Sequence, residues 1–175
     1  MKNDFEIYGW LLEENYPSIR YRTLLKLLAK QPDDPLVVKT KKEIVSSKPV
    51  MNLLSRMHPD GYWLDKNNKN EILGDGVAYT DYNTTHFCLA YLAELGMDKE
   101  HQQVYKAVNR YLDLQQSDGD FLHHFSCLNS YNIRTFIKLG FRDDPRVQKT
   151  IDLMLATDRH DGGYLCDMHE GKYKT

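Results

Sequence analysis

Two stretches of the sequence decide the fold: "AELGMDKEHQQVYKAVNRYLDLQQSDGDF" at residues 93–121 and "IKLGFRDDPRVQKTIDLMLATDRHDGGY" at residues 137–164. Their features agree in phase. Each stretch contains the end of a helix at a Leu-Gly pair, an acidic cap, a second helix, and an Asp-Gly turn closed by an aromatic residue. Gly140 follows Gly96 by 44 residues. The sequence therefore predicts a repeated helical hairpin.

Apolar residues recur at helical spacing along most of the chain, and no segment shows the sustained alternation of a strand. We expect Asp34, which precedes a proline, and Asp98 to cap helices, because an aspartate oxygen can accept a free N–H of the first turn. Thr80 or Asp81 is expected to cap the helix that ends at Gly96, where glycine can take a left-handed conformation. The sequence predicts an all-α protein.

The Asp-Gly turn occurs three times, as "DGYW" from Asp60, "DGDF" from Asp118 and "DGGY" from Asp161. Glycine supplies the tight backbone, aspartate binds local amides, and the aromatic residue packs the helices together. This recurrence favours a structural role for the turn itself.

Composition and charge exclude some classes of function. The formal net charge of −2 gives no basic face of the kind that nucleic-acid-binding proteins carry. The N-terminus lacks an apolar leader segment, and no run approaches the roughly 18 apolar residues of a membrane span. These features predict a cytoplasmic protein that neither spans a membrane nor binds nucleic acid.

The turns resemble the QW-type motif of the terpenoid cyclase and protein prenyltransferase superfamily, and "QSDGDF" at residues 116–121 is the most similar of them. The stretch "YPSIRYRTLLKLL" and residues 127–166 resemble the uncharacterised squalene-cyclase-like proteins of bacteria and archaea. The resemblance implies helical hairpins with inner and outer helices around an axial cavity. At roughly 44 residues per hairpin, the chain holds only about four of the five or six hairpins that a closed ring needs.

The expected fold is therefore an open, partial α/α toroid that forms a single domain over residues 1–175. We expect the chain to be the N-terminal part of something longer, or one partner of a homo-oligomer that covers the exposed end.

The superfamily's catalytic motifs are absent from the sequence. Squalene cyclases protonate their substrate with an Asp-x-Asp-Asp motif, and protein prenyltransferases hold zinc through an Asp-x-Cys pair and a distant histidine. Here Cys166 precedes Asp167, which is the reverse order. Whether the chain is an enzyme stays open. If it is one, it is a cyclase-like or prenyltransferase-like transferase or isomerase whose site is completed by missing repeats or by a partner.

Histidine, cysteine and aspartate residues follow two of the turns. His123 and His124 come after the second turn, and Cys166, Asp167 and His169 come after the third. If inner helices converge on one rim of the cavity, these side chains could meet there and bind zinc. The alternative is a set of polar residues at solvated helix starts, and on that interpretation the protein needs no cofactor.

The expected ligand is an apolar small molecule or a peptide, held in the concave cavity by dispersion and cation–π contacts. Two alternatives stay open: the aromatic residues only pack the hairpins, or the chain is a HEAT-like scaffold that binds a protein. The residues expected to line the cavity are Tyr79, Tyr82, His86, Phe87, His123, His124, Phe125 and Tyr131.

Overall fold

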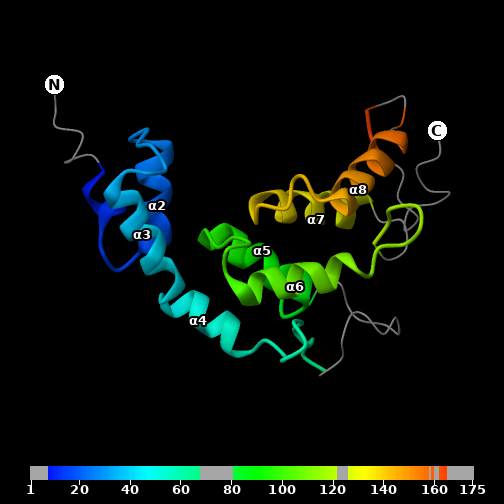
Figure 1. Cartoon of the computed structure of the whole chain (residues 1–175), viewed down its shortest axis with the longest axis horizontal. Helices are drawn as coiled ribbons and strands as arrows, with labels where there is room; N and C mark the ends of the chain where they lie inside the picture. The colour runs from blue at the N-terminus through cyan, green and yellow to red at the C-terminus, as the bar shows by residue number, and fades with distance from the viewer. Residues whose placement is uncertain (1–7, 68–80, 122–125, 158, 160–161, 165–175) are drawn as a thin grey trace. The chain divides into compact units, whose positions relative to one another are not determined.

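A computed structural model describes residues 8–67, 81–121, 126–157, 159 and 162–164. These ranges contain seven α-helices, one 3-10 helix and no β-strand, which confirms the all-α prediction (Figure 1). In chain order the elements are η1 (Gly9–Leu12), α2 (Pro17–Lys26), α3 (Pro35–Val45), α4 (Lys48–Ser55), α5 (Thr85–Leu95), α6 (Gln102–Leu112), α7 (Ser126–Lys138) and α8 (Pro145–Ala156). None of the described helices is long and apolar enough to cross a membrane.

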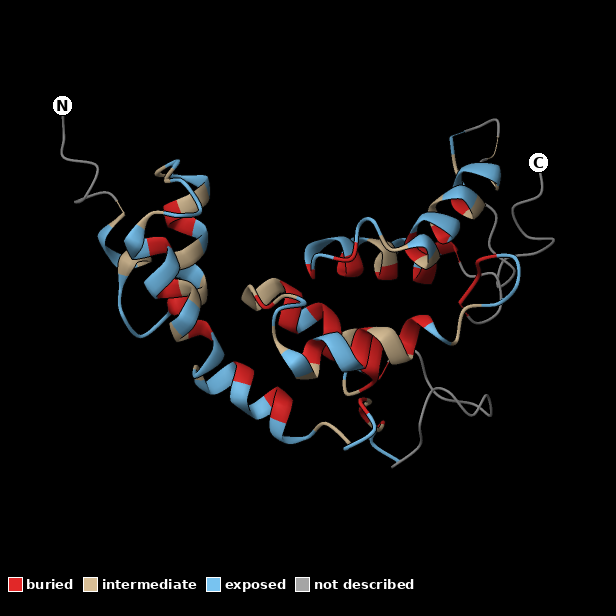
Figure 2. Ribbon diagram, in the orientation of Figure 1, coloured by how far each residue is buried: buried red, intermediate tan, exposed pale blue. Residues whose placement is uncertain are grey.

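The chain divides into two compact units. Unit 1 comprises Met1–Met57 together with Glu94–Met97, and unit 2 comprises His58–Ala93 together with Asp98–Thr175. Each unit buries its own apolar residues, which Figure 2 shows as red segments along its helices. The expectation of a single domain over the whole chain stays a prediction.

In unit 1, α2 and α3 pack side by side (Figure 1). A buried arginine links them: Arg20 Nε donates to Thr40 Oγ1 at 3.3 Å, and the Arg20 guanidinium also pairs with the Glu43 carboxylate. A buried charge is tolerated when it is paired and hydrogen-bonded in this way. The apolar core of the unit consists of Leu24, Val37, Ile44, Val50, Leu53, Leu54 and Met97.

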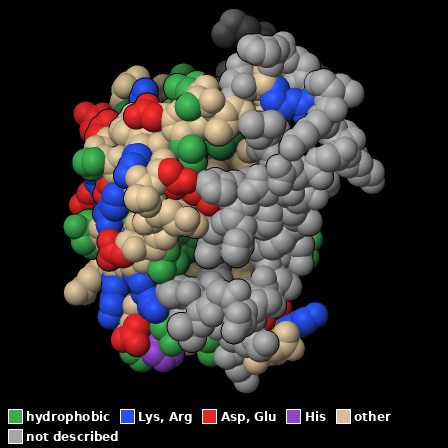
Figure 3. Space-filling model, turned by 90° about the vertical axis from the view of Figure 1, so that its right-hand side faces the viewer, with side chains coloured by type: hydrophobic (Ala, Val, Ile, Leu, Met, Phe, Trp, Pro, Cys, Tyr) green, Lys and Arg blue, Asp and Glu red, His purple; other side chains and the backbone are tan. Residues whose placement is uncertain are grey.

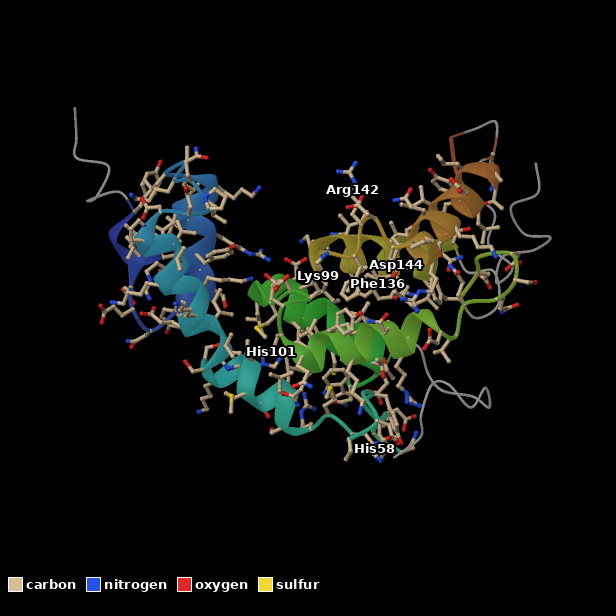
Figure 4. The ribbon with its side chains drawn as sticks, viewed as in Figure 1. His58, Lys99, His101, Phe136, Arg142 and Asp144 are labelled. Carbon is tan, nitrogen blue, oxygen red and sulfur yellow. The ribbon has the colours of Figure 1, made fainter. Side chains whose placement is uncertain are left out.

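In unit 2, three aromatic rings form the centre of the core. Tyr111 of α6 lies 5.6 Å from Phe121 and 5.8 Å from Phe136 of α7, and the two phenylalanine rings are 6.0 Å apart. Such offset and edge-on contacts are the favoured geometry for aromatic pairs. Figure 4 labels Phe136 among the side chains of unit 2. Trp63, Leu89, Leu92, Val104, Val108, Leu112, Leu139 and Val147 are buried in the same unit.

Two helices begin as the sequence predicts, at an aspartate followed by proline. Asp34 Oδ1 accepts the N–H of Leu36 at 2.9 Å, and Asp144 Oδ1 accepts the N–H of Arg146 at 2.9 Å. The helix ends are also confirmed, because Gly96 has φ of +93° and Gly140 has φ of +90°. Both values lie in the left-handed region that glycine takes without a Cβ penalty.

Two other predicted helix starts are wrong. Asp98 accepts the N–H of Glu100 at 3.1 Å in a turn, and α6 begins only at Gln102. Asp81 likewise accepts the N–H of Asn83 at 2.9 Å, and α5 begins at Thr85. In both places the aspartate side chain supports a turn that precedes the helix, which is the local hydrogen bonding that competes with helix formation.

Candidate functional site

The first two Asp-Gly turns are structural, because each packs closely against a later helix of unit 2. Gly61 has φ of +89°, and a Cβ there would lie 3.2 Å from Lys106 Cγ on α6. Gly119 has φ of +103°, and a Cβ there would lie 2.8 Å from the carbonyl oxygen of Lys149 on α8. Lys149 follows Lys106 by 43 residues. The first two turns thus each contact the equivalent position of a later helix.

The aromatic residue that closes each turn is held by the next helix. The N–H of Trp63 donates to Thr85 Oγ1 at 3.0 Å, and the N–H of Phe121 donates to Asn129 Oδ1 at 3.2 Å. Asn129 lies 44 residues after Thr85. Asn129 Nδ2 also donates to Oδ1 of the buried Asp120 at 2.7 Å. These carboxylate and amide groups therefore fix the turn and are engaged within it.

The third turn differs from the first two. Gly162 again has a left-handed φ, of +83°, but no described atom lies within 4 Å of a Cβ built there. Tyr164 is exposed, whereas Trp63 and Phe121 are buried. Asp161 lies outside the described residues.

Half of the residues predicted to line a ligand site lie together in unit 2. Tyr82, which precedes α5, stands 5.0 Å from Phe87 of α5, measured between ring centroids. Phe87 is 5.4 Å from Tyr131 of α7 and 6.3 Å from Tyr91 of α5. Tyr82 and Tyr91 are exposed, and Phe87 and Tyr131 are half-buried. We call these four residues and His86 the aromatic patch.

His86 is the buried member of the patch and contacts two of its rings. Its side chain is buried, with Nδ1 3.2 Å from Thr84 Oγ1 and its ring 4.4 Å from that of Phe87. The Tyr131 ring stands edge-on to it at 6.1 Å. His86 thus positions the two half-buried rings, and it is not itself at the surface.

Tyr91 was not among the predicted residues. It lies four residues after Phe87, so the helical period alone places it on the same face. Partial burial raises the pKa of its phenol, so the hydroxyl stays protonated, and able to donate a hydrogen bond, at neutral pH.

The other predicted site residues, Tyr79, His123, His124, Phe125, Cys166, Asp167 and His169, lie outside the described residues. Within the part of the chain that the structure describes, no group of three or more His, Cys, Asp or Glu side chains is arranged to hold a metal ion. The zinc alternative therefore stays a prediction about residues that the structure leaves undescribed.

A cavity of about 540 Å³ lies in unit 1, and sequence reasoning did not find it. It is lined by residues 14–19 at the start of α2, by Lys39 and Glu43 of α3, by residues 47–49 at the start of α4, and by Leu95. The sequence features that mark this region are the prolines at the starts of α2 and α4, in Tyr16-Pro17 and Lys48-Pro49. Neither helix has a side-chain cap.

Charged side chains are mixed in sign on the molecular face shown in Figure 3, where acidic and basic groups of the described residues alternate.

No protein-family model matches the chain, and comparisons with curated proteins and with solved structures found no match.

Proposed function

We propose that the protein binds an apolar small molecule or peptide at the aromatic patch on α5 and α7. The single observation that carries the proposal is the run of contacting rings from Tyr82 through Phe87 to Tyr131, which is only partly buried. Aromatic side chains bury large areas on contact with an apolar partner and provide most of the energy of such interfaces.

The geometry of the patch suits a ligand with an apolar body. Phe87 presents a hydrocarbon surface, and Tyr82 and Tyr91 add phenol groups at its edge. A tyrosine at such a place offers an apolar ring and one polar tip, so it can hold the body of a ligand and hydrogen-bond its end. We infer an isoprenoid-like or similarly apolar ligand.

We further propose that the hairpins repeat as an open, partial α/α toroid of the terpenoid cyclase and prenyltransferase type. Two hydrogen bonds of the same kind support this arrangement, from Trp63 to Thr85 and from Phe121 to Asn129. The two acceptor residues, Thr85 and Asn129, are 44 residues apart. Phe87 and Tyr131 of the patch are also 44 residues apart. On this proposal they are equivalent residues of successive inner helices.

Calorimetric titration with farnesol tests the proposed site. We expect Tyr82→Ala to weaken farnesol binding by about 3- to 10-fold, because an aromatic contact contributes roughly 0.5–1.5 kcal/mol beyond its buried area. The matched control is Tyr105→Ala on α6. Tyr105 is 53% exposed, against 68% for Tyr82, and its ring lies 5.8 Å from Phe141, just as that of Tyr82 lies near Phe87.

The control variant should bind farnesol as the unaltered protein does. Equal losses in Tyr82→Ala and Tyr105→Ala, or the absence of saturable farnesol binding, would contradict the proposal.

A further inference from the structure

The cavity of unit 1 has the size and the lining of a small-molecule site. Its volume of about 540 Å³ falls within the roughly 300–1,000 Å³ of typical ligand pockets. We propose that it binds a small amphipathic carboxylate, a single apolar chain that ends in one carboxylate group. The cavity shares no residue with the aromatic patch, and the proposal does not depend on the proposed function.

The apolar part of the ligand has a defined surface to contact. Tyr16 and Ile19 are 56% and 43% exposed, and both line the cavity. Pro17, Pro49 and Leu95 complete its apolar wall. Covering this surface with a hydrocarbon chain would remove it from water, which is the main source of affinity for such ligands.

The charges around the cavity favour a carboxylate head group. The Glu43 carboxylate is already neutralised by the buried Arg20 guanidinium and lies 3.9 Å from Lys39 Nζ. Lys48, at the start of α4, also lines the cavity and has no ion-pair partner among the described residues.

The acidic group that remains is Glu14, which is exposed at the edge of α2. The lining thus carries Lys39 and Lys48 against Glu14 and Glu43. The charge of Glu43 is already offset by Arg20, which does not itself line the cavity. A cation that is not already paired is available to a ligand carboxylate, and a charge-assisted hydrogen bond from an ammonium is stronger than a neutral one.

The test uses octanoate, with 1-octanol and octylamine as neutral and cationic probes of the same length, titrated into the full chain while backbone amide NMR shifts are followed. We expect saturable shifts at the cavity residues, with octanoate bound at least about threefold more tightly than either other probe. Lys48→Met should weaken octanoate binding by about threefold and leave 1-octanol binding unchanged.

Two further variants keep the test sharp. Ile19→Asp should weaken octanoate binding by roughly tenfold or more, and it should still fold, because Ile19 is solvent-exposed and an acidic residue suits the first turn of a helix. Lys42→Met is the matched control, since Lys42 is an exposed lysine of α3 that does not line the cavity. It should change nothing, and Tyr82→Ala in unit 2 should also leave octanoate binding intact.

Equal affinity for octanoate and octylamine would overturn the assignment of a carboxylate ligand. Indifference of octanoate binding to Ile19→Asp, or shifts that never saturate, would overturn the site itself.

Discussion

Glycine allows two things in the Asp-Gly turns, a left-handed backbone and a close approach to a later helix. Alanine substitutions at two of the turns separate these effects. Gly119→Ala places a Cβ 2.8 Å from a backbone carbonyl oxygen in a left-handed conformation, whereas Gly162→Ala meets only the conformational cost among the described residues. We expect losses in the free energy of unfolding of roughly 2–4 and 1–2 kcal/mol respectively. Urea unfolding of both variants measures them. Equal losses would mean that the close approach of the turn to α8 is not formed in solution.

The aspartate that caps α8 makes stability depend on pH. The Arg146 side chain and backbone N–H hydrogen-bond to Asp144 and lower the pKa of its carboxyl group. A lowered pKa in the folded state means that the contribution to stability is fully present above the usual carboxyl pKa of about 4, and that it is lost as the pH falls through the lowered value.

Replacing that aspartate should therefore matter at neutral pH and not in strong acid. We expect Asp144→Ala to lower the free energy of unfolding by about 1–2 kcal/mol at pH 7, with the difference fading below pH 4. The control is Asp143→Ala, which removes the same charge from the exposed neighbouring residue. Urea unfolding across this pH range compares them. A loss in Asp144→Ala that persists unchanged at the acid end would contradict the ionic cap.

At the scale of the elements, Thr85 and Asn129 each tie the aromatic residue of one turn to the helix that follows it. Asn129→Ala should cost roughly 2–3 kcal/mol, because Phe121 N–H loses its acceptor and the buried Asp120 loses a donor. Thr85→Val should cost about 1–2 kcal/mol by removing the acceptor of Trp63 N–H. Thermal unfolding with Thr157→Val as control tests both, since the Thr157 hydroxyl bonds only to carbonyls of its own helix end. Losses no larger than that of Thr157→Val would refute the role of these ties.

Helix content and several helix ends could be predicted from the sequence because local chemistry determines them. An aspartate before proline at Asp34 specified a helix start, and Gly96 and Gly140 specified left-handed ends. The starts near Asp81 and Asp98 could not be predicted in this way. At those aspartates a turn and a cap use the same short-range hydrogen bond, and sequence alone does not distinguish the two.

One candidate binding region could be predicted in part from the sequence, and the other could not. Phe87 and Tyr131 were both expected to line one cavity because they are aromatic residues near predicted helix starts, and the structure places their ring centroids 5.4 Å apart. The cavity of unit 1 joins segments around Tyr16, Glu43, Lys48 and Leu95. Tyr16, Glu43 and Leu95 are far apart in the chain, and no periodicity relates them. Only their packing creates the cavity.

For the molecule as a whole, we propose one ligand surface in each compact unit. Unit 2 has the aromatic patch around Phe87, and unit 1 has the cavity beside Ile19. The two differ in chemistry, because the patch consists of aromatic rings, while the cavity combines an apolar wall with charged side chains, Lys39 and Lys48 among them. The two proposals together call for two kinds of ligand.

The most direct test of the central claim is an isotope-filtered NOE spectrum of the labelled protein with unlabelled farnesol. It reports which protein rings lie within a few ångströms of the ligand. Binding at the aromatic patch predicts NOEs from the farnesol methyl groups to the rings of Tyr82, Phe87, Tyr91 and Tyr131. NOEs confined to other rings, such as those of Tyr16 or Tyr105, or no intermolecular NOEs at saturating farnesol, would contradict it.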